Sequence, residues 1–445
     1  MLGGAGQRLA VAAGAVAALW LAVLWATMGV APPLASQSGV ASPAASEPAA
    51  PAKPTLRAVA VSGAAAPGGG SYGPFGIEQQ TAPAAVNGAG DVAFFAKLMR
   101  TGADEALFLS RDGRTALVAA TGGGAPGGGT ITSFTERPAP SLNASGTVAF
   151  AATIEGGRAN EAVLSWTRGR LAAIAQSGAR APGVTGAAFF DFGPPAVNAA
   201  GDVAFLTTLR RGRETLDAVY ATGKGQLMKI AAAGDPAPGG GVFSAFAPPV
   251  INKNGVIAFG ALVEGGATTG GIYLADAGAL RLAVGAGDRA PGGGVFTRLS
   301  ERLGLDDAGR VAFGAFLGQG GPRSGIFITT EKGVQAVALL GAPAPSGGAF
   351  ASFGDSPALA PDGGLAFIAS VDGGVGTTGV FAYGSEGLAR IAGPGDTLAD
   401  GRRITGFPLN PSVSAGPNGR VAFQALLGSG EEPVDAIVAL APASR

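Results

Sequence analysis

Seven charged side chains stand on segments that are otherwise apolar, and these side chains are the first candidates for chemistry. They are Glu136, Arg137, Asp191, Arg298, Glu301, Arg302 and Asp355. A charge on an apolar strand costs free energy unless it is paired or hydrated. Two of the carboxylates held about 5 to 10 Å apart could hydrolyse a glycosidic bond. Mutual ion pairing around a watery channel would explain the same residues without any reaction, and a ligand site is the third alternative.

Three further carboxylates, Asp235, Asp288 and Asp396, lie in Gly-rich loops such as GDPAPGGG at 234–241. An aspartate in a tight turn usually accepts hydrogen bonds from the neighbouring backbone, and we expect that role here. A ring of these carboxylates binding Ca²⁺ is the alternative. We expect no other metal and no cofactor.

The composition excludes several kinds of catalysis. The 445 residues include no histidine and no cysteine, which excludes Ser-His and Cys-His mechanisms, disulfides and the commonest transition-metal ligands. The 30 basic and 30 acidic side chains give a net charge of zero, whereas nucleic-acid binding requires a concentrated positive field. We therefore expect no nucleic-acid partner and no enzymatic activity, with a His-free carboxylate enzyme kept as the alternative.

A motif, N-x-x-G-x-x-A-F, recurs along the chain. It is complete at 87–94, 143–150, 198–205 and 252–259, and it recurs at 306–313, 360–367 and 416–423 with Asp306, Ala360 and Gly416 in the first position. Its phenylalanines are spaced by 56, 55, 54, 54, 54 and 56 residues. Such a constant period indicates a repeat architecture. We expect the asparagine and glycine to build a turn, and the phenylalanine to pack between units.

Each unit contains four short apolar segments, which predicts a four-stranded blade. In the strand at 91–98 residues on both faces are apolar, as expected for a sheet covered on both sides. The predicted fold is an all-β, seven-bladed β-propeller, preceded by one N-terminal apolar helix. The last unit lacks its fourth strand, and residues 56–61 are predicted to supply it by pairing with 436–440, which closes the ring.

The seven units resemble the bacterial choice-of-anchor tandem-repeat family that this motif defines, over residues 56–441. The resemblance implies an envelope protein held by some form of anchor, and it implies no activity. The segment APDGGLAF at 360–367 also resembles, over a shorter stretch, the repeats of periplasmic Tol-system propellers.

The N-terminal segment is predicted to direct export. Residues 9–30 are uncharged and long enough to span a bilayer as a helix. Arg8 precedes them, and the next basic residue is Lys53, so the N-terminus is expected in the cytoplasm and the propeller outside it. The predicted organisation is a membrane anchor at 1–30, an Ala/Pro/Ser linker at 31–55, the propeller at 56–441 and a tail at 442–445. A cleaved signal peptide, which would give a secreted protein, is the alternative.

Three functional classes therefore stand open. The first is a binding or scaffold propeller in the envelope with a protein, peptide or glycan ligand. The second is a carboxylate enzyme such as a glycosidase, and the third is a structural spacer of the cell surface. Any ligand site is expected among the seven non-repeated charges and the Gly-rich loops, because turn chemistry and packing account for the repeated residues.

Overall fold

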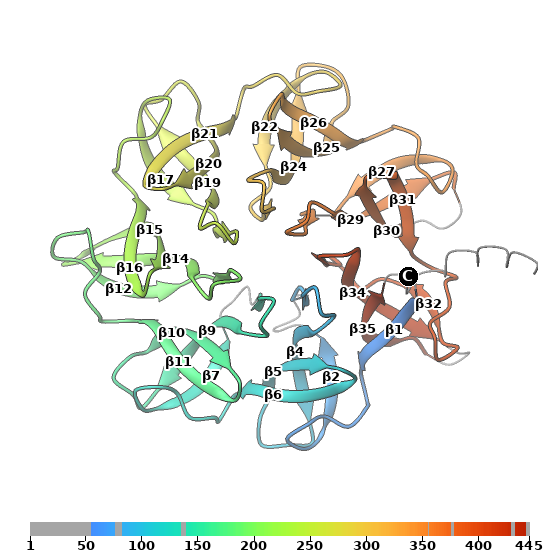
Figure 1. The fold of residues 1–445 in the computed structure, drawn as a ribbon, viewed down its shortest axis with the longest axis horizontal. Helices are drawn as coiled ribbons and strands as arrows, with labels where there is room; N and C mark the ends of the chain where they lie inside the picture. The colour runs from blue at the N-terminus through green and yellow to red at the C-terminus, as the bar shows by residue number, and fades with distance from the viewer. Residues whose placement is uncertain are drawn as a thin grey trace, which may run out of the picture. The chain divides into compact units, whose positions relative to one another are not determined.

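The computed structural model describes residues 55–75, 82–134, 139–354, 356–374, 378–428 and 432–441. These residues belong to a compact unit, Pro51–Arg445. All their regular elements are β-strands, and the strands form seven sheets arranged in a ring (Figure 1). The described part of the chain contains no helix long and apolar enough to cross a membrane. The predicted anchor at 9–30 and most of the linker lie outside the described residues.

All seven blades follow one antiparallel plan. A long strand B pairs on one side with strand A, which is broken into a longer piece A and a short piece A′, and on the other side with strand C. Strand C then pairs with strand D at the far edge of the sheet. The all-β, seven-bladed propeller predicted from the motif period is confirmed.

In the first six blades the chain passes through the strands in the order A, A′, B, C and D. Blade one contains β2 (Ser71–Phe75), β3 (Ala85–Val86), β4 (Val92–Met99), β5 (Glu105–Arg111) and β6 (Arg114–Ala120). Blade two contains β7 (Thr130–Phe134), β8 (Ser141–Leu142), β9 (Val148–Glu155), β10 (Glu161–Thr167) and β11 (Arg170–Gln176). Blade three contains β12 (Ala188–Phe192), β13 (Ala196–Val197), β14 (Val203–Arg211), β15 (Glu214–Gly223) and β16 (Gln226–Ala232).

The same order continues around the ring. Blade four contains β17 (Val242–Phe246), β18 (Val250–Ile251), β19 (Ile257–Glu264), β20 (Gly270–Asp276) and β21 (Ala279–Gly285). Blade five contains β22 (Val295–Leu299), β23 (Gly304–Leu305), β24 (Val311–Gly318), β25 (Ser324–Thr330) and β26 (Gly333–Leu339). Blade six contains β27 (Ala349–Phe353), β28 (Ala358–Leu359), β29 (Leu365–Asp372), β30 (Thr378–Gly384) and β31 (Gly387–Ala392).

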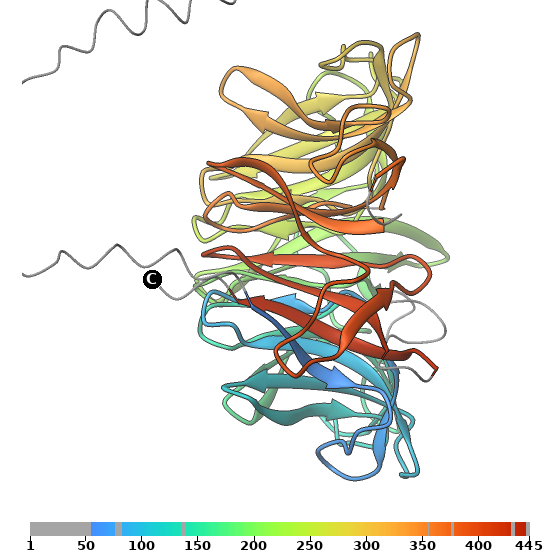
Figure 2. The ribbon, with the colours of Figure 1, turned by 90° about the vertical axis from the view of Figure 1, so that its right-hand side faces the viewer.

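Blade seven joins the two ends of the propeller. Its A, A′, B and C strands are β32 (Arg403–Gly406), β33 (Val413–Gly416), β34 (Arg420–Gly428) and β35 (Val434–Ala441), and its D strand is β1 (Thr55–Val61). The register pairs Leu56 with Leu440 and Val61 with Ala436. The blue β1 lies among the red strands of the C-terminus in both views (Figure 1 and Figure 2). The predicted closure by residues 56–61 is confirmed.

The hydrophobic core lies between blades. Seven clusters of buried side chains each join two neighbouring blades, one for every junction of the ring. The motif phenylalanine faces the preceding blade: Phe150 packs with Phe95 and Leu107 of blade one. Phe313 also stacks on Phe327 of its own blade, with 5.6 Å between ring centroids. The expected packing role of the motif phenylalanine is confirmed, since such burial is the main favourable term in folding.

Candidate functional site

The motif turn is built as its residue types predict. The Asn252 side-chain oxygen accepts hydrogen bonds from the N–H groups of Asn254 and Val256, both at 3.0 Å. Gly255 takes φ +82°, a backbone conformation that side chains rarely adopt. The glycines of the other six turns also have positive φ. The geometry of the turn therefore explains the asparagine and the glycine of the motif.

The asparagine also links each blade to the next. The side-chain amide of Asn198 donates to the backbone oxygen of Asn252 at 3.1 Å, and Asn252 donates in turn to the oxygen of Asp306 at 2.9 Å. Asn87 and Asn143 continue the same series. The neighbouring A′ strands contact one another in a complete cycle. Each A′ strand can contact those of both neighbouring blades only near the central axis of the ring. The motif turns, which directly follow the A′ strands, therefore line that axis.

Other contacts replace the link where the asparagine is absent. Asp306 has no amide to donate, and the Asp307 N–H bonds the Pro361 oxygen at 3.0 Å instead. The Asp362 carboxylate accepts from the Asn418 N–H at 2.6 Å, and Arg420 donates to the Gly88 oxygen at 2.9 Å. The repeated motif thus has a structural role, because its turns are linked from blade to blade around the ring.

The Gly-rich loops and their carboxylates also have local roles. Asp235 accepts from Lys229 and from the Ala232 N–H, both at 2.8 Å. Asp288 accepts from the Gly285 N–H at 2.7 Å, and Asp396 pairs with Arg390 at 3.0 Å. Asp235 and Asp288 thus accept the expected bond from the neighbouring backbone, whereas the contact of Asp396 is an ion pair. No group of three acidic, histidine or cysteine side chains that could hold a metal ion occurs within the described ranges.

Four of the seven predicted site residues can be placed. Asp191 on β12, Arg298 on β22 and Glu301 just after β22 line one cavity of about 1060 Å³, whereas Arg302 is not among its lining residues. Arg302 and Glu301 both have interaction partners. Glu136, Arg137 and Asp355 lie outside the described residues. The structure thus brings together three side chains that are up to 110 positions apart in the sequence.

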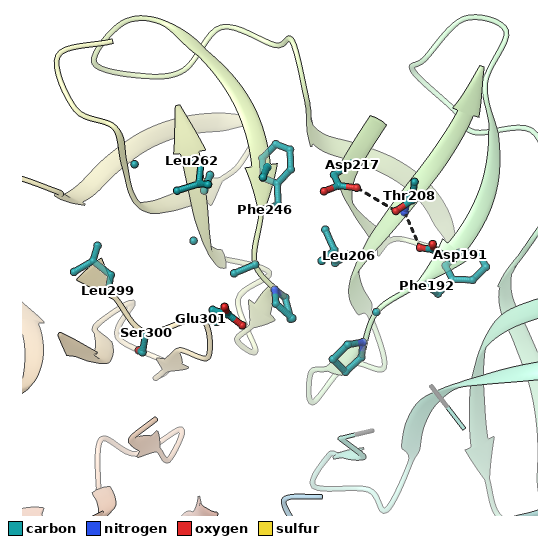
Figure 3. A pocket seen from close by; sticks show the side chains of 18 of the residues that line it. Asp191, Phe192, Leu206, Thr208, Asp217, Phe246, Leu262, Leu299, Ser300 and Glu301 are labelled. Atoms are coloured by element: carbon teal, nitrogen blue, oxygen red, sulfur yellow. Dashed lines mark hydrogen bonds between the residues drawn. The ribbon is translucent and has the colours of Figure 1, made fainter. Parts of the chain in front are cut away.

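The cavity runs along blades two to five and has a polar end and an apolar middle. At blade three the Thr208 N–H donates to Asp191 at 3.3 Å, and its hydroxyl donates to Asp217 at 3.1 Å (Figure 3). Phe246, Leu206 and Leu262 form the middle (Figure 3). Leu262 is 59% exposed, which is unusual for so large an apolar side chain. Arg298 on blade five is exposed and forms no ion pair within the described ranges.

A carboxylate at the start of strand C bridges to the next blade, a role that was not predicted from the sequence. Glu161 of β10 accepts from the Phe192 N–H on strand A of blade three at 3.1 Å. Asp435 of β35 accepts from the Phe75 N–H on strand A of blade one at 2.9 Å. We call such an acid a cap, because it satisfies a strand A donor that points away from strand B.

The cap has a sequence signal of its own. An acid followed by alanine stands at the same register position of strand C in blades one, two, three and seven: Glu105-Ala106, Glu161-Ala162, Asp217-Ala218 and Asp435-Ala436. The corresponding pairs in blades four, five and six are Gly270-Gly271, Ser324-Gly325 and Thr378-Gly379. The blades therefore fall into two classes, those with an acid at this position and those without one, and the cavity spans blades of both classes.

The comparisons with known proteins give a family but no activity. The model of a family of unknown function, DUF7453, matches residues 36–217 and 211–436. This chain belongs to the DUF7453 family. No curated protein matches the sequence.

Solved structures similar to this DUF7453 member include a puromycin-hydrolyzing peptidase of Mycobacterium tuberculosis. It is 15% identical with a TM-score of 0.46, over 86% of this chain and 55% of the peptidase chain. TolB of Acinetobacter baumannii is 16% identical with a TM-score of 0.35, over 66% of this chain and 64% of TolB. The polysaccharide lyase Uly1 is 8% identical with a TM-score of 0.44, over 89% and 100%. The DUF7453 chain thus spans less than two thirds of the peptidase and TolB chains.

The environment of the Asp435 cap shifts its titration. Burial disfavours its charged form and raises the pKa of Asp435 above its ordinary value of 3.8, although hydrogen bonds from Phe75 and Gln424 oppose the shift. The Gln424 amide nitrogen donates to Asp435 and also to the Phe75 oxygen at 3.0 Å. This cap therefore holds the junction between blade seven and blade one, where the ring closes.

Proposed function

We propose that this protein is a binding or scaffold propeller of the cell envelope whose cavity along blades two to five takes a peptide segment of a partner protein. One observation carries the proposal: the cavity joins an exposed apolar side chain, Leu262, to hydrogen-bonding groups at both of its ends. Ligand sites commonly combine an apolar lining with a few placed polar groups. The motif turns and the Gly-rich loops have structural roles. The cavity is lined by residues that differ between the blades, so we assign ligand recognition to it.

The partners of the carboxylates favour binding over catalysis. Asp191 and Asp217 both accept hydrogen bonds from Thr208, and Glu161 accepts one from the Phe192 backbone. A general acid in a glycosidase needs a carboxyl kept protonated near neutral pH, usually by burial away from donors. Here each of the three carboxylates is already engaged as an acceptor within the protein. A carboxylate enzyme therefore ranks second.

Replacing Leu262 with aspartate should abolish peptide binding. The full-length protein is used to select peptides from a random displayed library, and the selected peptides are synthesised and titrated. We expect Leu262→Asp to weaken their binding at least about 30-fold, since it removes about 2 kcal/mol of apolar contact and adds a charge.

Met228→Asp is the matched control, because Met228 is also large, apolar and exposed but lies on the outer strand of blade three, outside the cavity. It should leave the affinity unchanged. An equal loss in both variants would contradict the proposal. Failure to select any peptide, with binding to a glycan array instead, would replace the peptide by a carbohydrate, and binding to neither would favour the structural spacer.

The choice-of-anchor resemblance and the apolar segment at 9–30 support a location outside the cytoplasm. We expect the full-length protein to fractionate with membranes and to stay there after a high-salt wash, because an apolar tether is insensitive to ionic strength. Protease added to intact spheroplasts should digest the propeller. Recovery as soluble protein beginning near residue 36 would show a cleaved signal instead, and protection from protease would contradict export.

A further inference from the structure

The missing caps leave backbone donors unused inside the cavity. In blade five, Leu299 occupies the position that Phe192 occupies in blade three and Phe75 in blade one, as the strand registers show. The N–H groups of Phe192 and Phe75 are bound by Glu161 and Asp435. Since the alternation of strand A is the same, the Leu299 N–H points toward the start of strand C in blade four. Gly270 stands there, with no side chain to accept.

The next N–H along strand A, that of Ser300, donates to the Gly314 oxygen of strand B at 2.8 Å, so the Leu299 N–H points away from strand B, and no loop or side-chain acceptor among the described residues binds it. The Phe246 N–H of blade four is oriented in the same way, and Asp217 of blade three accepts from the Thr208 hydroxyl rather than from Phe246. Leu299 and Phe246 line the cavity, as do Gly270 and Gly271. The absence of a cap is enforced by packing: a β-carbon on Gly270 would lie 2.7 Å from the Ala261 carbonyl oxygen. A cap of the Glu161 kind therefore cannot fit here without moving the backbone.

We propose that a carboxylate of the ligand takes the place of the missing cap at the junction of blades four and five, accepting a hydrogen bond from the Leu299 N–H and pairing with Arg298. The inference rests on the proposed function and names the chemical group that the cavity recognises. Carboxylates accept the equivalent hydrogen bond at two other junctions, from Glu161 and from Asp435. Arg298 adjoins Leu299 on the same strand, exposed and without an ion pair among the described residues. Glu301, two residues further on, has a partner of its own.

The two ends of the cavity then differ in charge. Asp191 and Asp217 lie on blade three, toward one end of the cavity, and Arg298 and the Leu299 N–H lie on blade five, at the other end. A peptide segment with a carboxylate at one end and a basic or hydroxyl group at the other matches this arrangement, and its apolar part would contact Phe246 and Leu262. The carboxylate could come from an acidic side chain or from a C-terminus.

The backbone amide signals of the full-length protein report the site directly. Three probes are titrated in nitrogen–proton correlation spectra: sodium acetate, the peptide Ac-Ala-Glu-Ala-NH₂ and the peptide Ac-Ala-Ala-Ala with a free C-terminus. Ac-Ala-Gln-Ala-NH₂ and sodium chloride at equal ionic strength are the controls. We expect the Leu299 amide to shift with the carboxylates and not with the controls, and the Phe75 and Phe192 amides, which are already capped, to stay unchanged.

Substitutions distinguish a specific carboxylate-binding site from general effects of added ions. Arg298→Ala should weaken carboxylate binding about tenfold, as expected for the loss of a charge-assisted contact. Glu161→Ala should free a second backbone donor, so that acetate now shifts the Phe192 amide, whereas Glu161→Gln should not. The two peptides decide between a side chain and a C-terminus as the source.

The result that overturns the inference is a Leu299 amide that ignores all carboxylates, or a carboxylate response that survives Arg298→Ala unchanged. If library peptides bind through Leu262 and the Leu299 amide is silent, this inference fails and the proposed function stands. If acetate shifts Leu299 while no peptide binds, the proposed function fails and the carboxylate site at the missing cap stands.

Discussion

A chain that begins at residue 62 is expected to melt far below one that begins at residue 55. The first lacks β1 and the second keeps it, so the comparison isolates the strand that closes the ring. Without β1, strand β35 becomes an open edge, and Leu440 and Val438 lose their cover. Leu56 is buried, and removal of a buried leucine side chain by itself costs about 2 to 5 kcal/mol of stability. We expect the melting temperature to fall by about 10 °C or more, or the protein to aggregate through the exposed edge.

The measurement is thermal unfolding of both chains by circular dichroism, with size-exclusion chromatography to detect association. A synthetic peptide of residues 55–61 added to the shorter chain should restore part of the lost stability, because an exposed edge accepts an added strand. Equal melting temperatures for the two chains would contradict closure by β1.

The fold could be predicted because its signals are local and repeated. The motif turn is encoded within eight residues, and the missing strand D of the last unit follows from counting segments in one repeat. The structure shows a feature that counting segments could not predict. Strand A is split into two pieces, and the short pieces A′ of the seven blades together surround the axis. The split follows a bulge in strand A, at Phe189 and Asp191 in blade three, and no residue type marks a bulge of this kind reliably.

The cavity could be predicted in part. Asp191, Arg298 and Glu301 were found because their charges depart from the repeat, and they do line one cavity. Asp217 and Glu161 were missed because they follow a regular pattern, an acid before alanine, whose meaning depends on the neighbouring blade. The Phe192 N–H that Glu161 caps is 31 residues away. Periodicity identifies equivalent positions, but it does not show which groups of adjacent units come within hydrogen-bonding distance.

The second role of the motif asparagine illustrates the same limit. Turn chemistry predicts what the Asn198 side-chain oxygen does, but it predicts nothing for the amide nitrogen. That nitrogen donates to the backbone oxygen of Asn252 in the next motif turn, 54 residues further along the chain. Asp306, which differs from asparagine by one group, keeps the turn bonds to Ala308 and Arg310 and loses the link. The weakened motif copies thus mark the blades in which other residues carry the junction.

Removing the Asp435 cap is expected to destabilise the propeller where its two ends meet. Asp435→Ala leaves the Phe75 N–H without its acceptor and leaves the Gln424 amide with one partner fewer. Phe75 and Gln424 are both buried, each 3% exposed. An unsatisfied buried donor costs about 1 to 3 kcal/mol, so we expect a loss of about 2 to 4 kcal/mol in the free energy of unfolding. Chemical denaturation at pH 7 measures it.

Asp435→Asn should behave in the opposite way, and the pH dependence tests the reason. The asparagine oxygen can accept from Phe75. Its amide can donate to the Gln424 side-chain oxygen once the Gln424 amide turns over, because in the natural protein the Gln424 nitrogen faces both Asp435 oxygens and the Gln424 oxygen is buried without a hydrogen bond among the described residues. Since burial raises the pKa of Asp435 above 3.8 in the folded state, the native protein binds more protons than the unfolded chain between those two values. The contribution of Asp435 to stability is therefore full below the ordinary pKa and is lost as the pH rises through the folded one. We expect Asp435→Asn to match the natural protein at pH 7 or to exceed it by about 1 kcal/mol, and its advantage to shrink as the pH falls toward 4. A variant as unstable as Asp435→Ala, or an advantage that grows on acidification, would show that the charge itself holds blade seven to blade one.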